Sequence, residues 1–403
     1  MKKNFLKFFL IFFFLLNSAI LAESKNRPLK IAAILPLSGK YQDIGNNLLK
    51  TFELTIFELS NLNVSLLPFD NQSTKEGTKF AFQELQTEQI DIVIGPIFFE
   101  NLKEISADPN FTKYIFFSLT NYTENLPPNV ISFGVNVNSQ LDAVKPLLTK
   151  SNKTKIFFGE KNTFSELILT KMKNDKISFY KEYFFTDFQD IDKQSQIATS
   201  YWWRNKKLKD LIKKLNDSQN EEDKIKAKNL EKLDTLGGVN YQQVFVPSFD
   251  NNLISVLSFF DYYDVNYDDV QFISLNQWFD KKLLIEPSLQ NLIFPSINYN
   301  NYRELNDKFI KNFNQEISNI EILAYDLVPL LASVWHSKKE VAFAINDFID
   351  KEFKGKSGIF KITKSNTTQR QLNLYQIQNK QFKSFIDSFL GNFFNRFCIS
   401  IGL

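Results

Sequence analysis

Gly39 and Lys40 follow a short apolar run, at the place where a phosphate-binding loop would join a strand to a helix. A loop of the G-x-x-x-x-G-K-[ST] kind surrounds phosphate with backbone N–H groups and a lysine. Here the lysine follows the first glycine, and Tyr41 stands where the metal-binding hydroxyl belongs. The G-x-G-x-x-G pattern of dinucleotide sites is also incomplete, since only Gly39 and Gly45 are present. We therefore expect no nucleotide cofactor, and the sequence indicates no other cofactor.

Histidine and cysteine occur once each, at His336 and Cys398. These counts exclude a zinc site built from His and Cys, a Ser-His-Asp or Cys-His nucleophile, and an internal disulfide. His336 follows Trp335 in an apolar helical stripe, and we interpret it as a helix C-terminal residue. Catalysis by carboxylates alone stays open in principle, although adjacent acids such as Glu221–Asp223 are typical of solvated surface. We expect no enzyme activity, no catalytic residue and no metal site.

Residues 1–22 have a basic start, an unbroken apolar run from Phe8 to Leu16, and small residues up to Ala22. This is the pattern of a secretory signal peptide, and the apolar run is too short to span a bilayer. An uncleaved amphipathic anchor is the alternative. The residue directly after Ala22 is Glu23 and not cysteine, so we expect no lipid attachment of the bacterial kind. The sequence predicts a periplasmic protein, secreted through a cleaved signal peptide.

The charge balance argues against nucleic acid as a partner. The chain has 48 Lys and Arg against 45 Asp and Glu, and removing the three lysines of the signal leaves 45 of each sign. Nucleic-acid binding needs an excess of cations along one face. Only five arginines occur, and arginine is the usual reader of phosphate and guanine.

Short β-rich runs alternate with amphipathic helical stripes along most of the chain. The runs are Lys30–Leu37, Val64–Phe69, Ile90–Ile97, Tyr114–Thr120, Val130–Val135, Lys155–Gly159, Ile177–Phe185, Gln243–Phe249 and Val270–Asn276. This alternation indicates an α/β fold with mostly parallel sheets flanked by helices. About 380 mature residues exceed one ordinary sheet domain, so the sequence predicts two lobes.

Small and hydroxylated residues stand where several of these runs end. In open parallel sheets, the carboxyl ends of the strands form the ligand crevice, and small residues there let backbone N–H groups approach a ligand. Ordinary turn residues would give the same pattern. The candidate ligand-binding residues are Ser38, Gly39, Tyr41, Gly95, Pro96, Ser118, Thr120 and Asn121.

Four motifs in a fixed order resemble the first lobe of type I periplasmic binding proteins, the fold of branched-chain amino-acid receptors. They are P-L-S-G-x-Y-x-x-I-G from Pro36, D-x-V-I-G-P from Asp91, S-L-T-N from Ser118 and N-V-I-S-F-G from Asn129. The resemblance covers nearly all of residues 29–385. It implies two lobes joined by three crossovers.

The resemblance also implies where the lobes divide. Lobe 1 would comprise residues 28–137 and 290–360, with Leu292–Ser296 as the strand that returns to it. Lobe 2 would comprise residues 138–289 and 361–385. The crossovers would lie near 136–138, 286–291 and 361–368, and Gly355–Phe360 with Gln371–Gln376 would form a final hairpin.

Lobe 2 is most similar to one branch of this family. Trp203-Arg204 with a charged helical stretch, Leu233–Gly237, Gln243–Pro247 and Phe260–Val265 resemble the penicillin-binding protein activators of proteobacteria. This resemblance implies a regulator of cell-wall synthesis whose partner is a peptidoglycan synthase. Two features depart from the branch, namely the missing lipidation cysteine and the missing amino-terminal repeat domain. The alternative is the substrate-binding subunit of an ABC transporter for amino acids or a related solute, whose partner would be the permease.

The loop after Gly95-Pro96 departs from the amino-acid receptor pattern. That family usually places serine or small residues there, whereas this chain has Ile97, Phe98, Phe99 and Glu100. Two phenylalanines and an acid would crowd a zwitterion and oppose its carboxylate. We hypothesise that the inter-lobe cleft takes something other than a simple amino acid or binds no ligand. An acid in lobe 2 that could pair with an amine cannot be assigned, and Asp250 is one possibility.

Three further segments have two interpretations each. The insertion 203–236 has helical spacing on either side of a break at Asn216–Asn220, which predicts a helical hairpin. It either packs on its own lobe or is a docking arm for a partner protein. Phe259–Tyr263 is either a helix-to-strand packing segment or an exposed aromatic patch. The Phe-rich tail, residues 386–403, either caps a lobe or contacts a membrane or partner.

Overall fold

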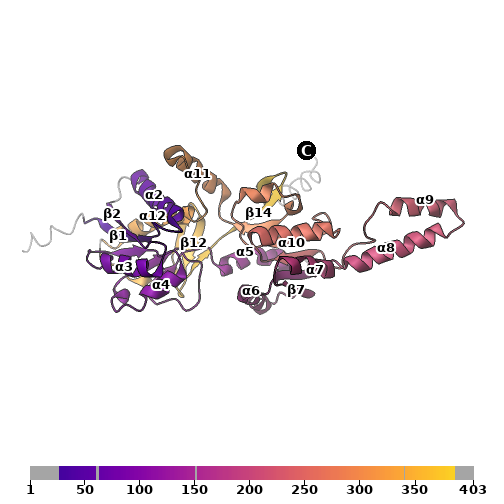
Figure 1. The fold of residues 1–403 in the computed structure, drawn as a ribbon. Helices are drawn as coiled ribbons and strands as arrows, with labels where there is room; N and C mark the ends of the chain where they lie inside the picture. The colour runs from indigo at the N-terminus through magenta and orange to yellow at the C-terminus, as the bar shows by residue number, and fades with distance from the viewer. Residues whose placement is uncertain (1–26, 60–62, 150–151, 340, 386–403) are drawn as a thin grey trace, which may run out of the picture. The chain divides into compact units, whose positions relative to one another are not determined.

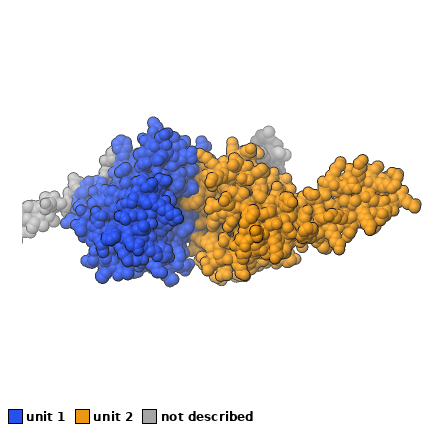
Figure 2. Space-filling view, in the orientation of Figure 1, with its two compact units in different colours: residues 1–136, 300–370 blue, residues 137–299, 371–403 orange. Residues whose placement is uncertain are grey.

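The computed structural model describes residues 27–59, 63–149, 152–339 and 341–385. The chain divides into two compact units, shown in different colours in Figure 2. Unit 1 comprises Met1–Asn136 and Asn300–Arg370, and unit 2 comprises Val137–Tyr299 and Gln371–Leu403. The expected signal peptide, the tail and Cys398 lie outside the described residues. Within the described ranges, no helix is both long and apolar enough to cross a membrane.

Unit 1 is built on a five-stranded parallel sheet in the order β2-β1-β3-β4-β5. The strands are β1 (Leu29–Leu35), β2 (Val64–Asp70), β3 (Ile92–Ile94), β4 (Phe116–Ser118) and β5 (Val130–Ser132). Six of the seven residues of β1 are buried, as a parallel strand covered on both faces requires. The parallel pairing puts the carboxyl ends of all five strands at one edge of the sheet.

The helices of unit 1 form two packed pairs, α2 with α12 and α3 with α4 (Figure 1). Their bounds are α2 (Gln42–Glu58), α3 (Lys75–Leu85), α4 (Phe99–Ile105), α11 (Tyr299–Phe313) and α12 (Glu321–Ser337). His336 lies in the last turn of α12, as the sequence predicted. Helix α2 buries Leu48 and Phe52, which lie four residues apart on one face of the helix. The hydroxyl of Thr74 caps α3 by accepting a hydrogen bond from the backbone N–H of Gly77, at 2.9 Å.

A second sheet of unit 1 is antiparallel and has the order β11-β12-β13. Its strands are β11 (Glu352–Gly355), β12 (Gly358–Ile362) and β13 (Thr368–Arg370). The Thr368 hydroxyl donates to the carbonyl oxygen of Ser132 at 2.8 Å, and the Ser132 N–H donates to that of Asn366 at 2.9 Å. These bonds attach the second sheet to the end of β5.

Unit 2 is built on a seven-stranded sheet in the order β15-β14-β10-β9-β8-β6-β7. Its strands are β6 (Lys155–Glu160), β7 (Lys181–Phe185), β8 (Gln243–Val246), β9 (Gln271–Ser274), β10 (Ile293–Ser296), β14 (Asn373–Gln378) and β15 (Gln381–Ser384). Strands β6 to β10 are parallel, and β14 and β15 add an antiparallel edge. The helices are α5 (Val137–Thr149), α6 (Thr163–Asn174), α7 (Phe188–Ala198), α8 (Tyr201–Asn216), α9 (Glu221–Leu230) and α10 (Asp250–Tyr262).

Two expectations about the lobe boundaries are wrong. Leu292–Ser296 does not return to the first lobe, because β10 pairs with β9 and β14 inside the sheet of unit 2. Gly355–Phe360 and Gln371–Gln376 do not form a hairpin with each other, because β12 pairs with β11 and β13 whereas β14 pairs with β10 and β15. The units divide after Asn136, Tyr299 and Arg370, so the second and third divisions fall later than the resemblance implied.

The insertion forms a helical hairpin from α8 and α9, which pack against each other. Leu208 of α8 and Ala227 of α9 are buried, whereas most other residues of both helices are exposed. The apolar seam therefore closes within the hairpin instead of against the sheet of unit 2. We call residues 201–236 the arm, and Figure 1 shows it extending beyond α7 and α10.

Candidate functional site

The eight predicted ligand residues all lie in unit 1, where Ser118 is the last residue of β4 and the other seven lie in the loops that follow β1, β3 and β4. The parallel sheet therefore brings these three loops to one edge, as the sequence predicted for a ligand-binding edge. Gly39 has φ +81° and Gly95 has φ +92°, and a Cβ atom on Gly95 would lie 2.3 Å from the carbonyl oxygen of Ile34. Glycine is required at Gly95 because this close approach leaves no room for a side chain.

Ser38 is engaged by a carboxylate that the sequence analysis did not single out. Its hydroxyl donates to Oδ2 of Asp70 at 2.6 Å, and its N–H donates to Oδ1 at 3.1 Å. Oδ1 also accepts from the N–H groups of Leu37 and Gln72. Burial raises the pKa of Asp70, but the donors from Ser38, Gln72 and Leu37 outweigh it and lower the pKa below its ordinary value. A ligand at Ser38 would have to displace an ionised carboxylate of the protein.

Ser118 and Thr120 are also engaged inside the loops. The buried Ser118 hydroxyl donates to the carbonyl oxygen of Pro96 at 2.6 Å. The Thr120 hydroxyl accepts from the N–H of Tyr122 at 3.2 Å, and the side chain is only 7% exposed. Asn121, by contrast, is exposed. The Ser118 hydroxyl therefore joins the end of β4 to the loop after β3, and the Thr120 hydroxyl is bonded within the loop after β4.

Aromatic rings cover part of the same edge. The ring of Tyr41 lies 4.7 Å from that of Phe98, and Phe99 stacks on Tyr122 with centroids 4.0 Å apart. Glu100 begins the exposed part of α4 and forms an ion pair with Lys75 at 3.4 Å. At this edge a ligand would therefore meet aromatic faces more than hydrogen-bond donors for a carboxylate.

The corresponding edge of unit 2 also has internally bonded polar groups. The side-chain amide of Gln277 donates to the Ser248 carbonyl oxygen at 2.9 Å and to the Ser274 hydroxyl at 3.1 Å. The carboxamide oxygen of Asn276 accepts from the N–H of Trp278 at 2.8 Å. Asp250, the one possible amine partner, lies exposed at the start of α10.

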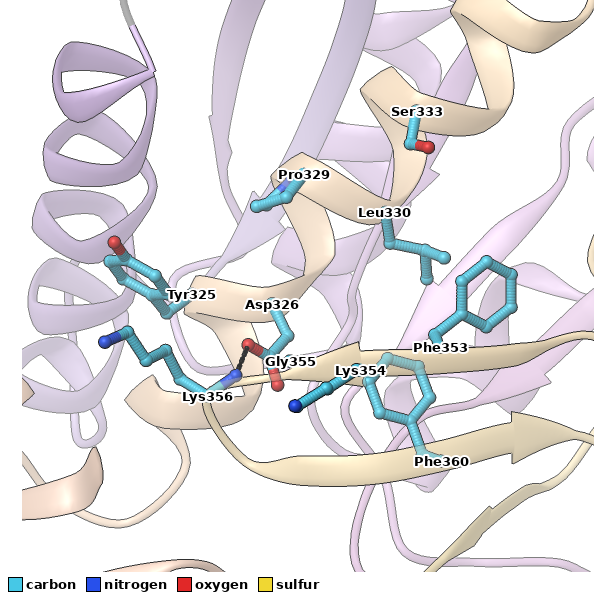
Figure 3. Close-up of a pocket in the computed structure, with 10 residues that line it drawn as sticks. All are labelled: Tyr325, Asp326, Pro329, Leu330, Ser333, Phe353, Lys354, Gly355, Lys356 and Phe360. Carbon is cyan, nitrogen blue, oxygen red and sulfur yellow. Dashed lines mark hydrogen bonds between the residues drawn. The ribbon is translucent and has the colours of Figure 1, made fainter. Parts of the chain in front are cut away.

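A cavity of about 510 Å³ lies in unit 1 between α12 and the β11–β12 hairpin (Figure 3). Its walls are largely apolar, with Pro329, Leu330, Phe353 and Phe360 among the lining residues. None of the eight predicted residues lines it. Within the described residues, no cluster of three or more His, Cys, Asp or Glu side chains could hold a metal ion.

The polar floor of this cavity is a buried network around Asp326. Its carboxylate accepts hydrogen bonds from the N–H of Lys356 at 2.6 Å, the N–H of Ser357 at 2.9 Å and the Ser357 hydroxyl. The same hydroxyl accepts from the guanidinium of Arg370 at 2.8 Å. Burial lowers the pKa of Arg370 to about 10, and the Asp326 carboxylate opposes that shift, so the guanidinium is charged at neutral pH. The network is structural, because its groups bond to one another.

Glu321, at the start of α12, is a buried carboxyl group with a raised pKa. The side chain is 0% exposed, its Oε2 accepts from the Ser318 hydroxyl at 2.5 Å, and its Oε1 has no partner among the described residues. Burial raises the pKa, and the Ser318 hydrogen bond opposes the shift. The folded state therefore holds a proton that the unfolded chain releases, so Glu321 contributes stability at low pH that is lost as pH rises through the folded-state pKa.

Glu321→Gln should accordingly flatten the pH dependence of the free energy of unfolding. The variant should gain stability relative to the wild type as pH rises above about 4.5, the ordinary pKa of the group, by about 1.4 kcal/mol for each unit by which the pKa is raised. Urea unfolding at several pH values measures this difference. The exposed Glu88→Gln variant is the control, and an equal effect in both variants would contradict the prediction.

Comparison with known proteins identifies the fold. No protein-family model and no curated protein matches the chain. Among solved structures, a Rhodospirillum rubrum protein assigned to branched-chain amino acid ABC transport has a TM-score of 0.67 and 9% identity, over 89% of this chain and 100% of that chain. The described chain thus has the type I periplasmic binding fold, with mostly parallel sheets flanked by helices in two units.

Two further structures have different functions on this fold. The branched-chain amino acid substrate-binding protein LivJ from Streptococcus pneumoniae, in complex with isoleucine, has a TM-score of 0.57 and 14% identity, over 89% of this chain and 98% of that chain. The C-domain of LpoA from Haemophilus influenzae, a regulator of PBP1A, has a TM-score of 0.59 and 14% identity, over 88% of this chain and 99% of that chain. These neighbours support a binding-fold protein, and identities this low establish the fold alone.

Proposed function

We propose that this protein is a non-enzymatic periplasmic regulator of cell-wall synthesis that binds a peptidoglycan synthase through its arm. The observation that carries this proposal is that the arm closes its apolar seam on itself and packs on unit 2 chiefly at α7. Two exposed helices that cover no sheet add little to the stability of the lobe. Their exposed faces are available to a partner protein.

The contacts at the base of the arm also favour a defined docking element. The buried guanidinium of Arg204 donates to the carbonyl oxygens of Gly237 at 2.7 Å and Asp264 at 2.9 Å, and to the Thr235 hydroxyl at 2.6 Å. The N–H of Leu236 returns to the carbonyl oxygen of Arg204 at 3.2 Å. These bonds hold together the two chain segments that enter and leave the arm at its base. A partner would therefore meet a preorganised surface.

The predicted ligand-binding edge supports the same proposal. Ser38, Ser118 and Thr120 use their hydroxyls within unit 1, and two aromatic pairs, Tyr41 with Phe98 and Phe99 with Tyr122, lie in the loops of the same edge. The similarity in fold to the LpoA C-domain, a regulator of PBP1A, also supports a regulatory role.

Shortening the arm tests the proposal. Residues 207–232 are replaced by a short Gly-Ser linker, which keeps Arg204, Thr235 and Leu236 in place. Purified protein of residues 23–403 should bind a peptidoglycan synthase of the same organism, and the shortened protein should lose that binding while unfolding at the same temperature. Equal binding by both proteins would contradict an arm-mediated contact, and no binding to any synthase would contradict the regulator.

The alternative function is a substrate-binding subunit of an ABC transporter. The amino-acid transport neighbours and the exposed Asn121 beside Ser118 and Thr120 favour it. A ligand present at 100 times its Kd should raise the free energy of unfolding by about 2.7 kcal/mol.

We expect no thermal shift of residues 23–403 with leucine, isoleucine or valine, because the hydroxyls of the predicted edge are internally bonded. The same screen includes small peptides and peptidoglycan fragments, so that it also tests ligands other than amino acids. A saturable shift with one amino acid would support the transport receptor and contradict the regulator.

A further inference from the structure

Helix α8 has a cationic face that is exposed along its length. Trp202, Lys206, Lys209 and Lys213 follow a spacing of i, i+4, i+7 and i+11, which places them along one side of the helix, and all four are exposed. Lys207 and Lys214 flank this stripe. Asp210 is the one acid within Tyr201–Asn216. Charge is unevenly divided within the arm, since α9 has three acids and three lysines.

The base of the arm adds an exposed aromatic surface. Four large side chains from α7, α8 and α10 are mostly exposed: Phe188 at 62%, Trp202 at 67%, Trp203 at 58% and Tyr262 at 73%. We call these four residues the aromatic surface. Successive ring contacts of 4.9 to 6.4 Å connect Trp202 through Tyr201, Tyr263 and Phe259 to Phe188. Exposed aromatic residues gathered in this way mark interaction sites more often than single ones do.

The two indole rings are held in place before any partner binds. Nε1 of Trp202 donates to Oε1 of Gln196 at 2.7 Å, and the ammonium of Lys207 lies 3.4 Å from the ring centroid of Trp203. Gln196 in turn donates to the hydroxyl of Tyr263 at 2.7 Å. Rigid aromatic anchors lose little entropy on binding, and tryptophan is enriched among residues that dominate protein interfaces.

Acids near the base of the arm do not cancel the charge of α8. Asp192 accepts from the hydroxyl of Tyr263, and Asp264 accepts from the hydroxyl of Thr235 and pairs with Arg204. Within the described residues, Lys206, Lys209 and Lys213 form no such ion pair with a carboxylate. The exposed face therefore presents cations beside fixed aromatic rings.

We propose that this face of α8, together with the aromatic surface, docks an acidic segment of a partner protein. The complementary segment would have carboxylates at the spacing of a helix and apolar side chains against Trp202. This inference rests on the proposed function and adds the chemistry of the partner. An anionic bilayer would attract the same lysines. The fixed indoles favour a protein, because rigid aromatic anchors are typical of protein interfaces.

A designed peptide tests the charge complementarity directly. The probe is a helical peptide with Glu at i, i+4 and i+7 and Leu at i+11, which matches the α8 stripe in the antiparallel direction. Its twin has Lys in place of each Glu. The full mature protein should bind the Glu peptide at least about tenfold more tightly than the twin, and the binding should weaken as NaCl rises. Equal binding of the two peptides, or none, would overturn the proposal.

Two triple variants locate the effect. Lys206→Glu, Lys209→Glu and Lys213→Glu together should reduce binding of the Glu peptide by at least about tenfold. The control is Lys226→Glu, Lys228→Glu and Lys232→Glu, which changes the net charge equally on the α9 side and should bind nearly as the wild type does. Trp202→Ala should weaken binding without lowering the unfolding temperature, since the ring is exposed. Equal losses in both triple variants would overturn the proposal.

Two more probes separate the alternatives. Binding to vesicles of phosphatidylglycerol and phosphatidylcholine, without binding to the Glu peptide, would overturn the proposal in favour of a membrane surface. A synthase that binds the α8 triple variant normally but not the shortened arm would overturn the charge proposal and leave the proposed function standing. Binding of the Glu peptide without binding of any synthase would support the charge proposal and contradict the regulator.

Discussion

Asp326→Ala should lower the free energy of unfolding by about 3–5 kcal/mol, because it removes a buried carboxyl group that interacts with the buried charge of Arg370. Burial raises the pKa of Asp326, and the hydrogen bonds from Ser357 and Lys356 and the charge of Arg370 oppose that shift. Arg370 is 3% exposed, and its guanidinium is held between the rings of Phe133 and Phe360, at 4.4 and 4.7 Å. The substitution also removes the acceptor for two backbone N–H groups and the Ser357 hydroxyl. Urea unfolding at neutral pH measures the loss.

Two further variants distinguish loss of the buried Asp326 network from loss of an acidic side chain in general. Asp307→Ala removes an exposed acid of α11 and should change the free energy of unfolding by less than about 0.5 kcal/mol. Combining Asp326→Ala with Arg370→Met should cost less than the sum of the two single changes, because the unpaired charge is then absent. Simple additivity of the two changes would contradict electrostatic coupling.

Arg204→Met should release the base of the arm and lower the free energy of unfolding by about 2–4 kcal/mol. The guanidinium is 4% exposed and joins α8 to the chain at Thr235–Gly237 and at Tyr263–Asp264. Methionine has a similar length but no donor, so several carbonyl oxygens lose their partner, at about 1–3 kcal/mol for each group left unsatisfied. We expect faster hydrogen exchange at residues 201–208 and 233–237.

The matched control for Arg204 is Lys214→Met, which removes an exposed cation from the same helix. This variant should unfold as the wild type does. Unchanged hydrogen exchange at the base of the arm in Arg204→Met would show that α8 is held by its other contacts with α7. If the regulator proposal is right, Arg204→Met should also weaken binding to the synthase, because the arm would lose its fixed orientation.

These two buried networks have different relations to function. The Asp326 network joins α12 to the β11–β12 hairpin within unit 1 and contains none of the predicted ligand residues. Arg204 fixes the element to which we assign the partner. Loss of synthase binding in Arg204→Met, with normal binding in the destabilised Asp326→Ala variant, would therefore connect binding to the arm instead of to general stability.

Local patterns in the sequence predicted the elements of the fold. The run Lys30–Leu37 contains β1, and the amphipathic segment after it forms α2, whose buried residues include Leu48 and Phe52. The spacing of apolar residues alone is enough to predict which face of a helix is buried. The helical hairpin of the insertion followed from its spacing in the same way. The α/β class and the type I periplasmic binding fold were both predicted correctly.

Strand pairing was less predictable, because partners far apart in the sequence leave no local pattern. Leu292–Ser296 reads as a buried strand, but its neighbours in the sheet, β9 and β14, decide which unit contains it. The segment Phe259–Tyr263 is partly buried and partly exposed, since Phe260 is fully buried and Tyr262 is 73% exposed. Both of the earlier interpretations of that segment therefore hold for part of it.

The sequence by itself determined the alternation of strands and helices, the absence of His and Cys chemistry, and the loops that reach one edge of the sheet. Only the tertiary structure decided which polar groups at that edge are free. Ser38 is bonded to Asp70, 32 residues away, and Arg204 reaches Asp264, 60 residues away. A hydroxyl or a guanidinium has the same sequence signature whether it faces a ligand or a distant part of its own chain, and only folding selects the partner.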